Sequence, residues 1–79
     1  MNLRSKNMFV EKWEMEQKDI RKQEIRQTTY STGIIDGKRI FQIQTYGGAG
    51  STSSAKQIIQ FDKDRAIELI RILSSEFGL

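Results

Sequence analysis

The side chains that could carry out catalysis are few in this chain and lack suitable partners. The 79 residues include no cysteine and no histidine, which removes a thiol nucleophile, a histidine base, a disulfide framework and a zinc site of the usual type. Two carboxylate pairs remain, Glu14 with Glu16 and Asp62 with Asp64. Neither pair has a neighbouring base, nucleophile or metal ligand in the sequence. The sequence therefore predicts a protein that is not an enzyme and that uses no cofactor or metal.

A glycine-rich stretch, Gly47–Gly50, is a second candidate because such loops can cradle phosphate. No Gly-Lys-Ser or Gly-Lys-Thr follows it, and the next element is expected to be a strand, whereas a phosphate loop leads into a helix N-terminus. We interpret residues 47–54, which are rich in glycine and serine, as a flexible loop between two strands.

Basic, amide and aromatic side chains in the strand half of the chain point to binding. The net charge is +3, and residues 1–39 hold nine Lys or Arg against six Asp or Glu, so the positive excess lies in that half. Cations can follow phosphates, glutamines offer adaptable hydrogen bonds, and an exposed aromatic ring can stack on a base. The same cations would also suit a solvated sheet edge that resists aggregation. The predicted nucleic-acid site consists of Arg21, Lys22, Lys38 and Lys56 for phosphates, and of Gln42, Gln44 and Tyr46 for bases.

These residues need a sheet to position them, and its clearest part is a hairpin over residues 30–46. Asp36-Gly37 lies between β-branched and aromatic runs and predicts a two-residue type I′ turn. With Ile35 opposite Lys38, alternation places one set of side chains on a core face and another on a polar face. The core set is Tyr30, Thr32, Ile34, Phe41, Ile43 and Thr45, and the polar set is Gln27, Thr29, Ser31, Gln42, Gln44 and Tyr46.

The segment before the hairpin admits two interpretations. Phe9, Trp13 and Met15 alternate with other residues, which favours a first strand over residues 8–17, then a turn at Lys18-Asp19 and a long second strand over residues 20–34. A helix over residues 8–26 is the alternative, because the Glu and Lys content suits one. Two further strands are expected, over residues 38–46 and 56–61.

A single helix is expected to close the chain. Asp62 is a natural N-cap, and residues 63–77 follow as a helix that ends at Gly78. Ala66, Ile70, Leu73 and Phe77 form a stripe that could cover the sheet. The helix carries further apolar residues, which predict a homodimer interface consisting of Ile67, Leu69 and Ile72.

The length and hydropathy of the chain set its general class. It is long enough for one domain, which we place at residues 8–79 after a basic arm at residues 1–7. No apolar run approaches the roughly 18 residues of a membrane span, and the first residues lack a secretory signal. We expect a cytoplasmic protein of the α+β class, with a curved four-stranded antiparallel sheet followed by one helix (ββββα).

The strands from Phe41 to Tyr46 and from Ile59 to Phe61, with the helix from Ala66 to Ile70, resemble those of positive-cofactor-four-like single-stranded-DNA-binding proteins, a transcriptional coactivator type with small bacterial and phage members. Arg21-Lys22 ahead of Glu24 is also similar to a basic family motif. Gln44 and Tyr46 stand where the family pattern has Arg and Trp. The resemblance implies a dimer that binds unpaired strands on its sheet face.

Two functions from different classes follow from these observations. The first is non-catalytic binding of single-stranded DNA or RNA by a homodimer, with little sequence preference. The alternative is a protein-binding accessory or inhibitor module of phage or mobile-element type that uses the same scaffold. A continuous basic groove across the sheet would favour nucleic acid, and scattered neutral polar residues would favour a protein partner.

Overall fold

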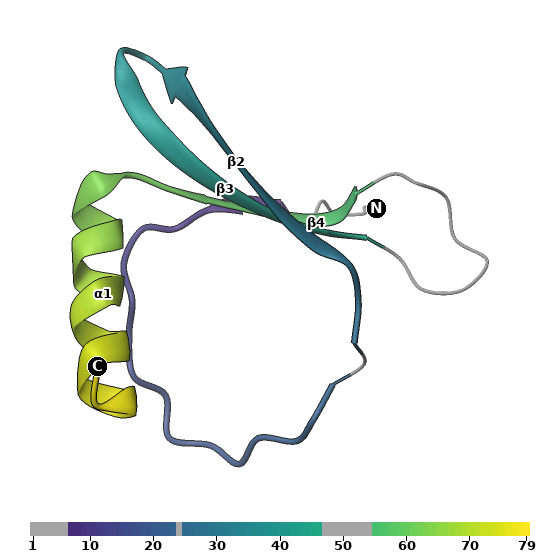
Figure 1. Ribbon diagram of the computed structural model, residues 1–79, viewed down its shortest axis with the longest axis vertical. Helices are drawn as coiled ribbons and strands as arrows, with labels where there is room; N and C mark the ends of the chain where they lie inside the picture. Colours follow the sequence, from purple (N-terminus) through teal and green to yellow (C-terminus); the bar gives the residue numbers. More distant parts are fainter. Residues whose placement is uncertain (1–6, 24, 47–54) are drawn as a thin grey trace.

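The protein consists of a small sheet followed by one helix (Figure 1). The computed structural model describes residues 7–23, 25–46 and 55–79. Its elements are β1 (Met8–Phe9), β2 (Thr28–Ile35), β3 (Lys38–Tyr46), β4 (Ala55–Phe61) and α1 (Lys63–Phe77). The predicted α+β class and the ββββα order are confirmed. The predicted loop at residues 47–54 and the basic arm, apart from Asn7, lie outside the described residues.

The four strands form one sheet in the order β1-β4-β3-β2. β3 is antiparallel to both β2 and β4, whereas β1 pairs with β4 in parallel, through Met8 opposite Ile59 and Phe9 opposite Gln60. The sheet is therefore mixed, where the sequence predicted an antiparallel one. The sequence could not show this, because the parallel pair joins residues at opposite ends of the chain.

The N-terminal segment, which we define as the described residues 10–23 and 25–27, differs most from the prediction. β1 ends at Phe9 and β2 begins at Thr28, and between them the described residues form neither the predicted strands nor the alternative helix. Charges of both signs dominate this segment, and its apolar residues follow no regular period. It therefore lacks the continuous apolar face that a strand or helix buries. In Figure 1 it forms a wide arc below the sheet.

The predicted hairpin is confirmed in its turn and in its register. Asp36 has φ 52° and Gly37 has φ 79°, and positive φ at both central residues is what a type I′ turn requires. Ile35 lies opposite Lys38, Thr32 opposite Phe41 and Thr29 opposite Gln44. A backbone bond of 3.1 Å from the Tyr46 N–H to the Gln27 carbonyl extends this register by one residue pair.

Aromatic rings gather on the face that holds Phe41. Phe61 is 4% exposed, and the ring of Phe41 lies 5.4 Å from it, centroid to centroid. Tyr30 stacks on the outer side of Phe41 at 5.3 Å, and Trp13 meets Phe61 edge to face at 5.9 Å. Ile40, from outside the predicted core set, is the second buried residue among those described, at 5% exposed. It lies opposite Gly33, and alternation along β3 places it on the face away from Phe41.

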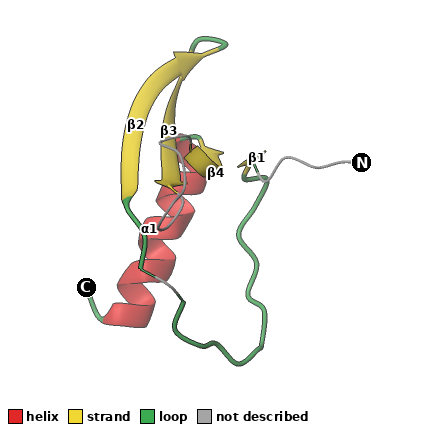
Figure 2. Cartoon of the chain, turned by 90° about the vertical axis from the view of Figure 1, so that its right-hand side faces the viewer, coloured by secondary structure: helices red, strands yellow, loops and turns green. Residues whose placement is uncertain are grey.

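The helix has the predicted ends but a different position. The Asp62 carboxylate accepts a bond from the Arg65 N–H at 3.1 Å, and Gly78, at φ 68°, ends the helix in the left-handed conformation. The predicted sheet-covering stripe is largely uncovered in the protomer, with Ile70 61% and Phe77 72% exposed. Figures 1 and 2 show the reason: α1 runs away from the sheet, and its first turn contacts the N-terminal segment.

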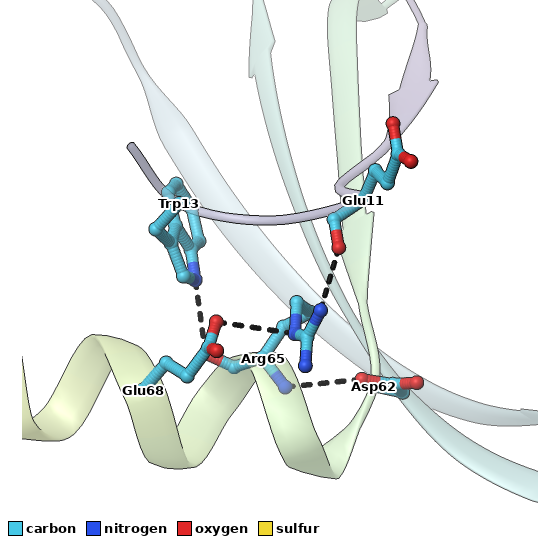
Figure 3. A network of polar contacts seen from close by, with 5 residues as sticks. All are labelled: Glu11, Trp13, Asp62, Arg65 and Glu68. Atoms are coloured by element: carbon cyan, nitrogen blue, oxygen red, sulfur yellow. Dashed lines mark hydrogen bonds and ion pairs between the residues drawn. The ribbon is translucent and has the colours of Figure 1, made fainter. Parts of the chain in front are cut away.

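Polar contacts at the first turn of α1 hold the N-terminal segment in place (Figure 3). The Trp13 indole N–H donates to the Arg65 carbonyl at 2.9 Å, and the Arg65 guanidinium donates to the Glu11 carbonyl at 2.6 Å. Arg65 also pairs with Glu68 at 3.2 Å, one turn further along the helix. Arg65 thereby connects the helix cap, the helix body and the N-terminal segment.

Candidate nucleic-acid interface

The face of the sheet opposite the aromatic rings is predominantly polar, and we call it the polar face. Alternation along β3 gives it Gln42, Gln44 and Tyr46, and pairing adds Thr29 and Ser31 from β2. From β4 it receives Gln60, which lies opposite Gln42, and Ile58, which lies opposite Gln44. Within the hairpin, the residues predicted for the polar face are therefore the ones that the structure places there.

A row of hydrogen-bonded side chains crosses this face, and we call it the amide row: Gln60, Gln42, Gln44 and Tyr46. The Gln60 Nε2 donates to Gln42 Oε1 at 2.8 Å, and the Gln42 Nε2 donates to Gln44 Oε1 at 2.5 Å. The Gln44 Nε2 then donates to the Tyr46 hydroxyl oxygen at 2.6 Å. All four side chains are half-buried, so mutual bonding fixes their orientation while one edge stays accessible.

The amide row leaves donors and acceptors for a ligand. Each amide nitrogen carries two hydrogens and uses one within the row, and each carbonyl oxygen has two lone pairs. The Tyr46 hydroxyl accepts the last bond, so its own proton can be donated outward. The row thus presents neutral groups of both kinds, which suit the edges of any nucleobase and select none strongly.

The sheet is free of negative side chains. Within the four strands as the structure describes them, the charged residues are Lys38, Arg39 and Lys56, and none is Asp or Glu. The acidic residues of the described chain lie in the N-terminal segment, the hairpin turn, the helix cap and the helix. A polyanion approaching the strands therefore meets no carboxylate on them.

The predicted phosphate-binding cations are dispersed. Lys38 begins β3 beside the hairpin turn and is exposed, and alternation places it on the polar face. Arg21 and Lys22 are exposed in the N-terminal segment, away from any strand. Lys56 lies near the start of β4, and its side chain is outside what the structure describes. The structure thus brings Gln42, Gln44 and Tyr46 together but leaves Arg21 and Lys22 off the sheet.

Three residues of the polar face escaped the sequence prediction: Gln60, Ile58 and Phe9. Gln60 and Ile58 could not be placed, because neither strand by itself reveals the register of β3 with β4, which shifts between Thr45 and Tyr46. Phe9 was expected on the same side as Trp13, yet its partner Gln60 puts it on the polar face. The chain leaves the sheet after Phe9, so alternation no longer relates the two aromatic residues.

The predicted dimer residues divide between two environments. Leu69 and Ile72 line a groove of about 630 Å³ between the helix and residues 13–16, together with Trp13 and Met15. Ile67 is half-buried on the helix. The more exposed apolar residues of α1 are Ile70 and Phe77. The exposed apolar surface of the helix therefore includes most of the stripe that had been expected to cover the sheet.

The described residues contain no cluster of three or more acidic, Cys or His side chains that could hold a metal ion. Within the same residues, no helix has the length and hydropathy needed to cross a bilayer. No family model, curated protein or solved structure matches this chain.

Proposed function

We propose that the protein binds single-stranded nucleic acid, DNA or RNA, without catalysis and with little sequence preference. The observation that carries the proposal is the amide row ending on Tyr46, on a sheet without carboxylates. Unpaired bases have free edges for the amides and a π face for the ring, whereas a duplex hides both. Membership in the positive-cofactor-four-like family is part of this proposal, and the ββββα order supports it. The compartment proposed for this role is the cytoplasm.

Phosphate contacts would come from the cations around the row. Lys38 is the best placed, since it belongs to the same face of β3 as Gln42 and Gln44. Arg21, Lys22 and Lys56 complete the proposed set. Four such contacts give a slope of about −2.8 for log affinity against log salt, at roughly −0.7 for each contact with a single strand.

Fluorescence anisotropy with a labelled single strand and the matching duplex tests the proposal. We expect tighter binding of the single strand, and a slope smaller in magnitude by about 0.7 for Lys38→Gln. Arg71→Gln, an exposed cation on α1, is the matched control and should leave the slope unchanged. Tighter binding of duplex, or an affinity that does not respond to salt, would refute the proposal.

The binding unit in this proposal is a homodimer. In the protomer the apolar face of the sheet is open at Tyr30, 71% exposed, and the helix is open at Ile70 and Phe77. A hollow of about 240 Å³, lined by Phe41, Phe61, Ala66 and neighbouring residues, lies between the sheet and the first turn of the helix. Burying each large apolar side chain is worth roughly 1.5–3 kcal/mol, and a second copy of the chain offers matching apolar surface. Sedimentation should give twice the monomer mass at micromolar concentration, and Ile70→Glu should halve it.

A protein-binding accessory module is the second candidate function. One observation favours it: the amide row is uncharged, and Arg21 and Lys22 lie off the sheet, so no continuous basic groove crosses the described strands. A parent protein that ignores every oligonucleotide at low salt would make this candidate the better one.

A further inference from the structure

The edge strand β1 adds an aromatic side chain to the polar face. Phe9 lies opposite Gln60, whose side chain begins the amide row, whereas Met8 lies opposite Ile59 on the other face. Phe9 is 48% exposed, and none of the described ring pairs includes it. The aromatic rings that pack together are all on the opposite face, so Phe9 is not needed to fill the core.

Beside Phe9 the surface forms a shallow hollow. It has a volume of about 310 Å³, and it is lined by Asn7, Met8, Phe9, Gln42, Ile58 and Gln60. Ligand pockets in proteins begin at roughly 300 Å³, so this hollow has room for one small planar group. The Asn7 Oδ1 accepts a bond from the Ile58 N–H at 2.9 Å, which ties the edge of the hollow to β4. The Phe9 ring thus forms one part of the lining, and the side-chain amides of Gln60 and Gln42 form another part.

Phe9 and Tyr46 therefore occupy the two ends of the amide row. Phe9 is level with Gln60 and Gln42 but two strands away from β3, a separation of about 10 Å at the usual strand spacing. Tyr46 lies four residues beyond Gln42 along β3, about 14 Å at the usual rise. The diagonal between the two positions is about 17 Å. That distance exceeds the spacing of one stacked pair of rings, so a single strand that reached both rings would place a different base on each.

We infer that Phe9 and the adjoining hollow form a second base-binding subsite, and that an unpaired strand crosses the sheet diagonally from Phe9 to Tyr46 along the amide row. This inference rests on the proposed function and adds the path of the ligand. The ligand class is an unpaired nucleobase of DNA or RNA. The Phe9 ring has no hydrogen-bonding group, so this subsite accepts purines and pyrimidines alike and contributes affinity through stacking.

The affinity test compares Phe9→Leu with Met15→Leu, a substitution at an apolar residue of the N-terminal segment that is 83% exposed. The probe is a labelled oligo(dT) of about a dozen nucleotides, within the roughly 4 to 16 that one such domain covers. Phe9→Leu keeps apolar volume and removes the π face, so affinity should fall about 5- to 100-fold. Met15→Leu should stay within about twofold, since Met15 lines the groove beside α1 and is not on the polar face. Tyr46→Leu, measured in the same assay, tests the contribution of the ring at the other end of the amide row.

Photocrosslinking of the unmodified protein provides a measurement that does not depend on the folding of a variant. A 5-iodouracil oligonucleotide irradiated on the protein should attach to the tryptic peptide of residues 7–12, in which Phe9 is the single aromatic residue. It should also attach to the peptide that contains Tyr46. Moving the iodouracil along the oligonucleotide should shift the yield from one peptide to the other.

The outcomes separate the two claims. A parent that binds, with Tyr46→Leu weakened, Phe9→Leu unchanged and no crosslink in residues 7–12, overturns the second subsite and leaves the proposed function standing. A parent that does not bind the oligonucleotide overturns both. Loss of affinity in Phe9→Leu together with the crosslink supports the diagonal path.

Discussion

Trp13 is the point at which the N-terminal segment is attached to the rest of the protein, and two substitutions separate its contributions. Trp13→Phe keeps a ring against Phe61 and removes the 2.9 Å bond to the Arg65 carbonyl, which is worth about 0.5–1.5 kcal/mol. Trp13→Ala removes both. Truncating a large aromatic side chain costs about 3–5 kcal/mol when it is buried, and Trp13 is half-buried, so we expect about 3 kcal/mol.

Thermal unfolding followed by far-ultraviolet circular dichroism measures these differences. In a domain of this size each kcal/mol lowers the midpoint by about 4–8 °C, so Trp13→Phe should melt roughly 4–8 °C below the parent. Trp13→Ala should lose several times more. Met15→Ala is the control, because Met15 lies two residues away and is 83% exposed. If Trp13→Ala is no less stable than Met15→Ala, the N-terminal segment is not anchored at α1 through Trp13.

Three further substitutions test local features. Asp62→Ala should lower the free energy of unfolding in urea by about 1 kcal/mol through loss of the helix N-cap, and Asp62→Asn should restore most of it; equal stability of all three forms would contradict the cap. Gly37→Ala should cost about 1 kcal/mol because φ is 79° in the turn, whereas Gly33→Ala, at a position with open space, should cost less. Phe61→Ala should cost about 3–5 kcal/mol and leave the isolated protein largely unfolded by circular dichroism; a folded variant would mean that the aromatic cluster is not the core.

Elements with local signals could be predicted from the sequence. The hairpin depends on Asp36-Gly37, two adjacent residues whose conformation determines the pairing of both strands. The helix depends on Asp62 at one end and Gly78 at the other, and both act within one turn of the chain. In each case the residues that determine the structure are neighbours in sequence.

The elements that were mispredicted depend on contacts between distant residues. A strand over residues 8–17 was a reasonable interpretation of Phe9, Trp13 and Met15, but the Trp13 indole N–H bonds to the helix at residue 65, and this contact draws the chain away from the sheet. The same contact helps to place α1 beside the N-terminal segment and away from the sheet. The periodicity of the segment could not predict this contact, because the partner residue lies more than 50 positions later in the chain.

In the candidate site, too, the residues placed by local signals were predictable, and those placed by contacts between distant segments were not. Gln42, Gln44 and Tyr46 follow from alternation along one strand whose turn is defined, and the structure places them on one face as expected. Gln60 and Phe9 required the register of β4 and the parallel pairing of β1. The predicted phosphate-binding residues Arg21 and Lys22 had been placed on the first part of a strand over residues 20–34, but the strand begins only at Thr28, so the basic part of the site is the least predictable.

The contacts of the first described residues also have a consequence for the order in which the chain folds. Asn7, Glu11 and Trp13 bond to partners 51 to 54 residues further along. During synthesis these residues leave the ribosome before their partners have been made. The hairpin, β4 and the helix can form from near neighbours, whereas closing the long chain between residue 13 and residue 65 is entropically costly and slow. Exposed apolar residues such as Met15, Ile20 and Ile25 therefore remain accessible to chaperones and proteases until the helix has been translated.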